Sequence, residues 1–487
     1  MIFSIVWSVG GLLEQTDRIL FHEHLVQKNV PIPAKANQND TIFDYYLDTS
    51  KGVEWRICVP EEWKPPLSFQ FAQTLIPTLD SFKANILLDA ILKQPKSNIC
   101  NRAVMLVGVS GTAKTSGILM YSEKFNREVM LFKRMNFSSA TRPLTFQSNV
   151  EIECDFKMGK DFAPPQGKQM TVFIDDINMP QVNKWGDQET LEIVRQLIEF
   201  GGFYWLDKSM RGNFKNIKNL SYIGAMQHPG GGKNDVPNRI KRQFFIFNMV
   251  LPSSVELIYG PILKHIFKPA KFSAEFNKVV DAITAGTVKL WNKVKNTLLP
   301  TPAKFHYVFN MRELSRIFKG LVGVRRDIVL SGSTLGFKPE IFLIALWRHE
   351  SERVFVDKLT NNKEKEQVKN YIHEISLETF TQFESEILDK FKKETPIHFV
   401  DFLREDQVNE EGVVEVLAEK VYEGINNIEK LQARCYALLD NYNVKYSSKK
   451  MGLVLFDDAM CHLIRISRII QQPRSSALLV GVGGSGK

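Results

Sequence analysis

The 487-residue sequence predicts an α/β protein in which a parallel sheet flanked by helices is followed by an all-helical region. Between residues 101 and 250, short apolar runs alternate with helical patterns, which is typical of strands buried on both faces of a parallel sheet. From Leu251 to about residue 395 the pattern is mostly helical, with no series of strands. A glycine-rich turn between a predicted strand and a predicted helix, in residues 104–118, lies inside the α/β region.

The first hundred residues are predicted to contain helices, loops and one pair of strands. The stretch SIVWSVGGLLEQTDRILFHEHL has helical spacing, and a polar loop with prolines follows it. The stretches TIFDYYLD and VEWRICVP alternate like short strands. A further helix is predicted in LIPTLDSFKANILLDAILKQ, with Pro77 and Thr78 at its start.

The α/β region and the end of the chain each have their own pattern. The predicted strands of the sheet are AVMLVG, VMLF, MTVFID, LSYIGAM and QFFIFNMV. Near the end of the chain, the stretch EGVVEVLAEKVYEGINNIEKLQARCYALL predicts one amphipathic helix, with core packing as the default role of its apolar stripe and a partner-binding coil as the weaker one. That stripe consists of Val414, Leu417, Val421, Ile425, Ile428 and Cys435.

The composition indicates a soluble globular protein of several domains, with 44% hydrophobic and 24% charged residues. No apolar run approaches the roughly 18 residues that cross a bilayer, so no membrane partner is expected. The start MIFSIVWSVGG has no basic stretch before it and is interpreted as a core helix, not a signal peptide. Because this start lacks any helix cap, the sequence leaves open whether Met1 is a natural beginning.

The cysteines and the net charge argue against a disulfide framework, a zinc site and a nucleic-acid footprint. The 5 cysteines have no CxxC or Cys/His spacing, which indicates a reducing compartment without a disulfide framework or zinc site. The net charge of +9 is dispersed along the chain and not gathered in a patch. A solvated surface with some phosphate-facing residues therefore explains this charge better than a nucleic-acid footprint does.

The glycine-rich turn has the residues of a phosphate-binding loop. A polyphosphate needs inward-pointing backbone N–H groups, a helix N-terminus and a cation. Gly108, Gly111 and the residues between them supply the first, and a helix beginning near Thr115 supplies the second. Lys114 can reach the β- and γ-phosphates, and the Thr115 hydroxyl can ligate Mg²⁺. Ala113 stands where such loops usually have glycine; because a helical φ is still allowed for alanine, we expect nucleotide binding to persist.

A pair of carboxylates follows a buried strand, as phosphate chemistry requires. In TVFIDDINMP, Asp175 stands at the tip of the strand, where it can hold the water shell of Mg²⁺. Asp176 has the position of the base for an attacking water, where many such ATPases have glutamate. Its side chain is one methylene shorter, and a misplacement of about 1 Å can slow a reaction roughly a hundredfold. The sequence thus predicts a P-loop NTPase with the strand of Asp175 beside the strand of the loop.

The loop pattern occurs a second time. LLVGVGGSGK, at residues 478–487, again leads from a predicted strand into a glycine-rich turn with a lysine. The first glycines of the two loops, Gly108 and Gly481, are 373 residues apart, so the repeated unit is a large module.

The residues of several motifs resemble those of one protein family. GTAKT, NFSSAT, TVFIDDINMP, WGDQ, HPGGG, FHYVFN and FVDFLRE resemble the third AAA+ module of axonemal dynein heavy chains, with the outer-arm type nearest. The stretches LVLFDDAMCHLIRISRIIQ and ALLVGVGGSGK resemble the opening of the fourth module, and IFSIVWSVGG to FDYYLD resembles the lid of the second. The resemblance covers essentially the whole chain and implies that it is part of a much larger ring-shaped motor.

This resemblance implies a domain organisation. Residues 1–58 would be the end of the preceding AAA+ module, 59–250 a large α/β nucleotide-binding domain, 251–398 a small helical lid, and 399–487 the start of the next module up to its P-loop. In that second loop, Gly481, Gly486 and Lys487 would face phosphate.

The resemblance also implies roles for individual residues. Gln227, at the end of SYIGAMQ, would orient water near the γ-phosphate, and Arg312 in FNMREL would sense that phosphate from the lid. Arg239 would be an arginine finger acting on the neighbouring module's site, with Arg242 behind it, while the Lys114 site would receive its arginine from the fourth module. The segment covering the adenine, for which a simple helix-starting turn is an equal alternative, would be Leu75, Ile76, Pro77 and Thr78. The residues facing the phosphates and Mg²⁺ would be Gly108, Val109, Ser110, Gly111, Thr112, Ala113, Lys114, Thr115, Asp175 and Asp176.

The implied function is ATP or ADP binding with Mg²⁺ in a regulatory module of a ciliary or flagellar microtubule motor, with slow hydrolysis. Partners would be the other modules of the ring and, through the whole heavy chain, intermediate chains, light chains and microtubules, in the axoneme of the cytoskeleton. Two alternatives stay open: an active ATPase module, and an AAA+ enzyme that remodels another polymer such as nucleic acid or protein. The dispersed charge and the lack of aromatics beside basic runs disfavour nucleic acid.

Overall fold

The computed structural model divides the chain into two compact units. One unit comprises residues 1–64 and 75–253, and the other comprises residues 65–74 and 254–487. Within these units the structure describes residues 1–50, 52–66, 69–94, 102–230, 232–251, 255–267, 272–332, 335–391, 396–408, 414–416, 418–473 and 475–479.

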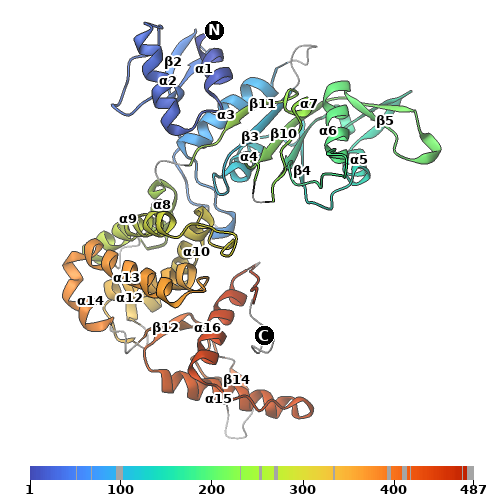
Figure 1. Ribbon diagram of the computed structural model, residues 1–487. Helices are drawn as coiled ribbons and strands as arrows, with labels where there is room; N and C mark the ends of the chain where they lie inside the picture. The colour runs from blue at the N-terminus through green and yellow to red at the C-terminus, as the bar shows by residue number, and fades with distance from the viewer. Residues whose placement is uncertain are drawn as a thin grey trace. The chain divides into compact units, whose positions relative to one another are not determined.

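The first unit is built on a five-stranded parallel sheet (Figure 1). The strands lie in the order β11-β3-β10-β7-β4, and every neighbouring pair is parallel. Their carboxyl ends therefore meet at one edge, where Val107 pairs with both Met226 and Asn248. The strands are β3 (Ala103–Val107), β4 (Met130–Asn136), β7 (Gln169–Asp175), β10 (Leu220–Met226) and β11 (Phe245–Asn248).

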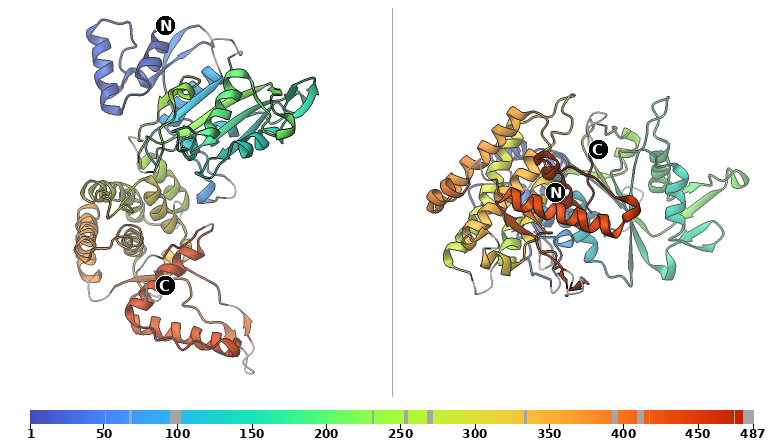
Figure 2. Two further views of the ribbon diagram at one scale, coloured as in Figure 1. Left: turned by 45° about the vertical axis from the view of Figure 1, so that its right-hand side comes forward. Right: turned by 90° about the horizontal axis from the view of Figure 1, so that it is seen from below.

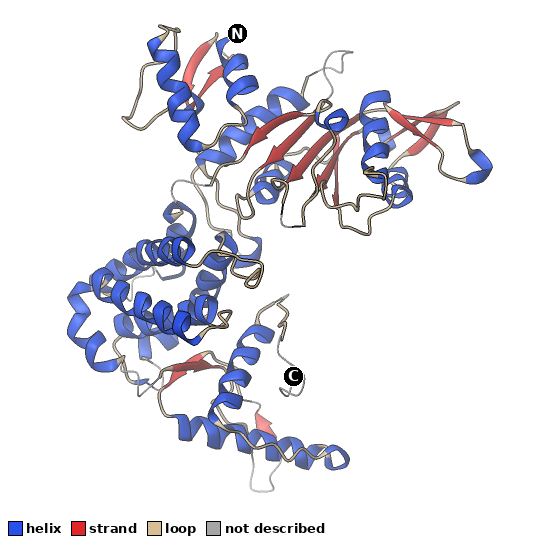
Figure 3. Cartoon of the chain, in the orientation of Figure 1, coloured by secondary structure: helices blue, strands red, loops and turns tan. Residues whose placement is uncertain are grey.

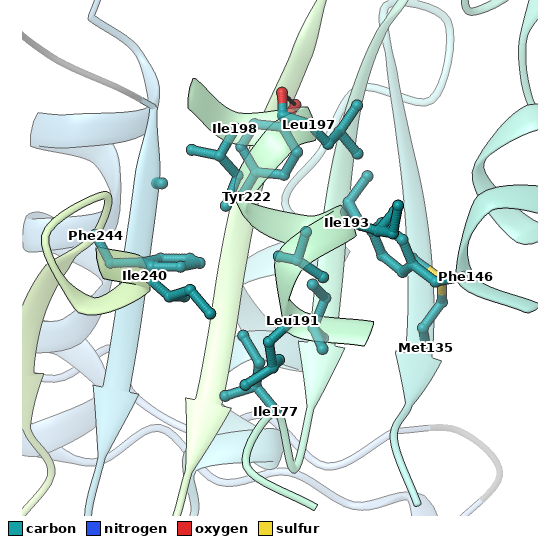
Figure 4. Packing of buried hydrophobic residues seen from close by; sticks show 14 of the residues in the cluster. Met135, Phe146, Ile177, Leu191, Ile193, Leu197, Ile198, Tyr222, Ile240 and Phe244 are labelled. Atoms are coloured by element: carbon teal, nitrogen blue, oxygen red, sulfur yellow. Dashed lines mark hydrogen bonds between the residues drawn. The ribbon is translucent and has the colours of Figure 1, made fainter. Parts of the chain in front are cut away.

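Helices cover both faces of this sheet, which confirms the predicted α/β architecture. Alternate strand residues point to opposite faces, so Met105 and Ile174 pack into one core and Leu106 and Phe173 into another. Figure 4 shows the first of these cores, where Leu197 lies close to Tyr222 of β10 and Leu191 lies close to Ile177. The helices over this face are α5 (Pro143–Glu151), α6 (Glu189–Phe200) and α7 (Asn238–Lys241), and those over the other are α1 (Ile2–Gly10), α3 (Leu79–Leu92) and α4 (Lys114–Glu123).

A second, four-stranded sheet was not predicted. In Figure 1 and the left view of Figure 2 it lies beyond β4, the edge strand of the large sheet. Its core contains the buried Lys215, whose Nζ is 2.8 Å from Glu151 and 3.5 Å from the centre of the Trp205 ring. Its strands have only three or four residues each, too few for a clear alternation. They are β5 (Asp155–Met158), β6 (Asp161–Ala163), β9 (Phe214–Ile217) and β8 (Gly202–Tyr204), in that order.

The first 60 residues of this unit follow the prediction closely. Helices α1 and α2 (Gln15–Gln27) precede an antiparallel pair, β1 (Tyr45–Asp48) and β2 (Glu54–Ile57). Arg18 of α2 joins this part to the large sheet, because its Nη2 donates to the carbonyl oxygen of Asn248 at 2.9 Å.

The second unit is largely helical, as Figure 3 shows by colour. This agrees with the pattern predicted after Leu251, and the strands of this unit are short and lie near its end. The helices before residue 392 are α8 (Glu256–Phe267), α9 (Ala274–Thr297), α10 (Met311–Val322), α11 (Arg326–Ser331), α12 (Pro339–Ser351), α13 (Asn362–Thr379) and α14 (Glu384–Lys390). After them come β12 (His398–Val400), β13 (Gln407–Val408), β14 (Val414–Val416), β15 (Glu423–Ile425), α15 (Ile428–Lys445) and α16 (Asp457–Gln471).

The prediction of one long amphipathic helix near the end of the chain is wrong. Val414 lies in β14 and Ile425 in β15, which pair antiparallel with β13 and β12, while Leu417 lies outside the described residues. The helix α15 begins only at Ile428, where the Asn427 side chain caps it by accepting from the backbone N–H of Lys430 at 2.8 Å. The β-branched residues before this cap favour strands, and Gly424 disfavours a continuous helix.

A buried ionic cluster joins α12 to α16. Glu350 is fully buried, and its carboxylate accepts from Arg468 and, at 2.9 Å, from the hydroxyl of Tyr422. Gly320 of α10 lies against the same carboxylate, which a Cβ at this position would strike. A larger residue at 320 would therefore disturb the cluster.

Two further predictions concern membranes and disulfides. Among the described residues, no helix is both long and apolar enough to cross a bilayer. The described cysteines are free thiols, and burial raises the pKa of Cys58 to about 12 and that of Cys154 to about 11. Cys100 lies outside the described residues.

Candidate functional site

The glycine-rich loop connects β3 to α4, as predicted, and its geometry requires glycine at two positions. A Cβ on Gly108 would lie 2.5 Å from the carbonyl oxygen of Met249, a distance that real structures do not tolerate. Gly111 has a φ of +90°, which favours glycine. The loop therefore passes close to the end of β11 and turns sharply into the helix.

Ala113 does not adopt the helical φ that alanine allows, and its backbone is strained. Its φ is 58° and its ψ 21°, in the left-handed region, directly before α4 begins at Lys114. This conformation costs a residue with a Cβ roughly 1–2 kcal/mol. The turn places the carbonyl oxygen of Ala113 to accept the first helical bond, from the backbone N–H of Gly117 at 2.7 Å. The strain is therefore the consequence of placing alanine at a position whose geometry suits glycine.

The ammonium of Lys114 lies within the loop. It donates to the carbonyl oxygens of Gly108 at 2.7 Å and Val109 at 2.8 Å, and to the Thr112 hydroxyl at 3.2 Å. Together with the N-terminus of α4, this buried cation makes the loop electropositive. An anionic phosphate group is the chemistry that such a loop favours.

Thr115 and Asp175 meet at the carboxyl edge of the sheet. The Thr115 hydroxyl lies 3.1 Å from Oδ1 and 3.0 Å from Oδ2 of Asp175. Hydroxyl and carboxylate oxygens are the hard ligands that Mg²⁺ prefers, so these two residues fit this ion. One expectation needs correction: β10 lies between β3 and β7, so the strand of Asp175 is not the neighbour of the loop strand. The two groups still meet because parallel strands end at the same edge.

Asp176 is bound by a cation of the chain itself. Its φ is 53°, and its Oδ1 lies 3.2 Å from the Nζ of Lys233. The carboxylate is 44% exposed, so a water molecule can reach it. Lys233 comes from the loop after β10, and no sequence pattern indicated this contact.

Gln227 directly follows β10 and so lies between the loop strand and the carboxylate strand. Its carbonyl oxygen accepts from the side chain of Asn178 at 3.0 Å, which joins the ends of β10 and β7. A water-orienting role for its side chain remains a prediction.

Residues 75–78 have a structural role at the start of α3. Thr78 and Ser81 form a reciprocal cap: the Thr78 N–H donates to the Ser81 hydroxyl at 2.8 Å, and the Ser81 N–H to the Thr78 hydroxyl at 3.2 Å. Ile76 is buried, while Leu75 and Pro77 are partly buried. Adenine contact by this segment stays a prediction alongside the cap.

The predicted arginines lie on, or directly after, helices other than α4, and no contact with the residues of the loop is described for them. Arg239 on α7 is exposed and pairs with Glu192 of α6 at 3.0 Å, and Arg242 pairs with Glu199 at 2.9 Å. Arg312 is an exposed residue at the start of α10, in the second unit. Their proposed roles stay predictions, and Gly481, Gly486 and Lys487 lie outside the described residues.

Arg134 is a site residue that sequence reasoning missed. It lies on β4, and its Nη2 is 3.0 Å from Oδ2 of Asp175. The feature that would have revealed this contact is the register of β4 with β7, which pairs Arg134 with Phe173 and Asn136 with Asp175. A single sequence does not reveal such a register.

Clusters of three or more His, Cys, Asp or Glu side chains that could hold a metal do not occur among the described residues. A Mg²⁺ ion bound here would therefore depend on few protein oxygens, with phosphates and water completing its shell, as is usual for this ion.

Comparison with protein families gives four matches along the chain. Residues 63–252 match the family "P-loop containing dynein motor region", and residues 283–391 match "AAA+ lid domain". Residues 451–487 match "P-loop containing dynein motor region D4", and residues 1–57 match "Dynein heavy chain AAA lid domain".

Curated relatives match the entire chain. It is 41% identical to the dynein gamma chain of the flagellar outer arm of Chlamydomonas reinhardtii, over 100% of this chain and 11% of that protein. It is 40% identical to dynein axonemal heavy chain 5 of Rattus norvegicus and 39% identical to dynein axonemal heavy chain 8 of Mus musculus, again over 100% of this chain but 14% and 10% of those proteins. The chain thus spans about a tenth of the length of these relatives.

A solved structure, that of NtrX from Brucella abortus in complex with ADP, matches 66% of this chain and 69% of its own. Its TM-score of 0.33 and sequence identity of 12% are too low to support an argument.

Proposed function

Because the chain belongs to the axonemal dynein heavy chains and forms part of their AAA+ motor region, we propose that the site at Lys114 binds ATP or ADP with Mg²⁺. In this proposal residues 59–250 are the large domain of one module and 251–398 its lid. Residues 1–58 end the preceding module, and 399–487 begin the next.

One observation carries the proposal: four elements bring the required groups to one edge of the sheet. The loop after β3 holds the buried Lys114, and α4 presents Thr115 at 3.0 Å from the carboxylate of Asp175. Gln227 follows β10 at the same edge. Cation, hydroxyl, carboxylate and polar strand tip are together the chemistry that holds a magnesium nucleotide.

We propose further that hydrolysis is slow and that the module is regulatory. The base position is occupied by the short side chain of Asp176, which pairs with Lys233. This ammonium draws the carboxylate toward itself and opposes its gain of a proton from water. Bound nucleotide would then act mainly by setting how the large domain lies against its lid, where Arg312 would sense the γ-phosphate.

The setting of this module is also a proposal. As in its relatives, it would belong to a heavy chain of the ciliary or flagellar axoneme. Its immediate partners would be the other modules of one motor ring. Through the whole heavy chain, the partners would include intermediate and light chains and microtubules.

Nucleotide binding is tested with Lys114→Ala in the 487-residue chain, by titration calorimetry with ATP and ADP in the presence of Mg²⁺. We expect binding to be lost, because the variant lacks the cation of the loop. Lys124→Ala is the matched control, since Lys124 directly follows the same helix and pairs with the exposed Glu61. Equal affinities of Lys114→Ala and the unaltered chain would refute the site.

A further inference from the structure

Arg134 contacts the carboxylate that is expected to serve Mg²⁺. Its Nη2 lies 3.0 Å from Oδ2 of Asp175, whose side chain is 14% exposed. The Thr115 hydroxyl approaches both oxygens of the same carboxylate. Asp175 is thus already held by one cation and one hydroxyl of the chain.

Other contacts fix the position of the Arg134 side chain. Its Nε donates to the Asn136 side chain at 3.0 Å, and its guanidinium lies over the Phe173 ring at 5.9 Å from the ring centre. The register of β4 and β7 pairs Asn136 with Asp175 and Arg134 with Phe173, so all four residues share one face. Strand pairing therefore positions Arg134 for its contact with Asp175.

A guanidinium and Mg²⁺ make competing demands on one carboxylate. Mg²⁺ is attracted by the negative charge of Asp175, and the permanent positive charge of Arg134 cancels much of it. A Mg²⁺ ion that enters must either displace Arg134 or stay close to a like charge. Both alternatives weaken binding of the ion.

We propose that Arg134 competes with Mg²⁺ for Asp175 and so raises the Mg²⁺ concentration at which this site takes up its magnesium nucleotide. This inference rests on the proposed nucleotide binding at Lys114. In this inference, one side chain of β4 determines how much Mg²⁺ the site needs to bind nucleotide.

The test measures the Mg²⁺ concentration for half-maximal binding of a fluorescent ATP analogue to the 487-residue chain. Arg134→Gln removes the charge but keeps a long polar side chain over Phe173. We expect the half-saturating Mg²⁺ concentration to fall about three- to tenfold, as for loss of one charge-assisted contact at a partly exposed site. In an Asp175→Asn background the same substitution should have no effect.

Lys133→Gln is the matched control. Lys133 is the preceding residue of β4 and points to the opposite face, where it pairs with Glu153 at 2.7 Å. An unchanged Mg²⁺ requirement in Arg134→Gln, or an equal shift in Lys133→Gln, would overturn the inference. If Lys114→Ala abolishes analogue binding while Arg134→Gln leaves the Mg²⁺ requirement unchanged, only the role of Arg134 is refuted. If Lys114→Ala binds the analogue normally, the proposed function is refuted as well.

Discussion

Arg468 of α16 and Glu350 of α12 form a buried ion pair although 118 residues separate them in sequence. Glu350 is 0% exposed and Arg468 10% exposed, and the carboxylate holds the pKa of the guanidinium above its usual range. Glu350 lies in the segment that matches an AAA+ lid, and Arg468 in the segment that matches the next P-loop region. The pair therefore ties two family segments together inside one compact unit.

Arg468→Met should lower the free energy of unfolding by about 3–5 kcal/mol, because it leaves the charge of Glu350 buried without its partner. Urea denaturation followed by circular dichroism measures this loss. Arg316→Met is the control, since Arg316 is 63% exposed and pairs with Glu313 one turn away. That control should cost less than about 1 kcal/mol. Equal losses in the two variants would show that the pair made by the buried Arg468 contributes no more than the pair made by the exposed Arg316.

Ala113→Gly should raise the free energy of unfolding by about 1 kcal/mol, because glycine adopts the left-handed conformation without strain. The thermal midpoint of the chain checks this. Ala433→Gly is the control and should instead lower the free energy of unfolding by about 1 kcal/mol, because Ala433 is an exposed residue within the helix α15. A lower midpoint for Ala113→Gly would contradict the strain at this position.

Lys233→Met should raise the rate of ATP hydrolysis about three- to tenfold without changing nucleotide affinity, because it frees Asp176 from a competing cation. Steady-state phosphate release measures the rate. Lys241→Met is the control, since Lys241 lies in the same region and pairs with Asp235 at 2.8 Å. A fall in the rate would instead mean that Lys233 holds Asp176 in its productive orientation.

Arg239→Ala should leave nucleotide affinity at the Lys114 site nearly unchanged in this chain, because Arg239 pairs with Glu192 and is proposed to act on a neighbouring module. Calorimetry with ATP checks this. In a complete ring, the same substitution should disturb the response of the preceding module to nucleotide. Loss of binding as large as that of Lys114→Ala would make Arg239 a residue of its own module's site.

The stability of the helical unit should fall as the pH decreases from about 6.5 toward 4. Burial and the nearby Arg353 and Arg465 lower the pKa of His398 to about 4, so the folded chain keeps this imidazole neutral. The unfolded chain takes up a proton near pH 6.5, and stability present above that value is lost below it. Burial lowers the pKa of His349 as well, in the same direction.

Urea denaturation at pH 7.5, 6.0 and 5.0 tests this dependence. His398→Gln should reduce the loss of stability on acidification, because the substituted side chain does not titrate. The exposed His462 supplies the control His462→Gln, which should keep the full loss. An unchanged pH profile in His398→Gln would exclude His398 as a source of the acid sensitivity.

Local patterns predicted the parts of the site that depend on a few adjacent residues. The loop around Lys114 and the strand ending at Asp175 are such parts, since a glycine-rich turn and a buried apolar run are visible in one stretch of sequence. The helix predicted across Val414 and Ile425 failed for the complementary reason. Its apolar residues fit helical spacing, but pairing with strands elsewhere decided their conformation.

Contacts that depend on the order and register of strands could not be predicted from the sequence. Arg134 reaches Asp175 only because β4 lies beside β7, and Lys233 reaches Asp176 only because the loop after β10 passes it. The left-handed conformation of Ala113 likewise follows from how the loop turns into α4. A single sequence shows which residues are adjacent in the chain. These three features depend on the tertiary arrangement, which brings together segments that are distant in sequence or fixes how a loop turns.

The central place of β10 has a consequence for hydrogen–deuterium exchange. Every residue of this strand is buried, and it bonds to β3 on one side and β7 on the other. Its amide hydrogens can exchange only when the sheet itself opens, so they should be among the slowest in the first unit. A ligand at the edge of the sheet would then slow amide exchange in the loop around Lys114. The exchange rates of β10 would not change, because its amides are already protected.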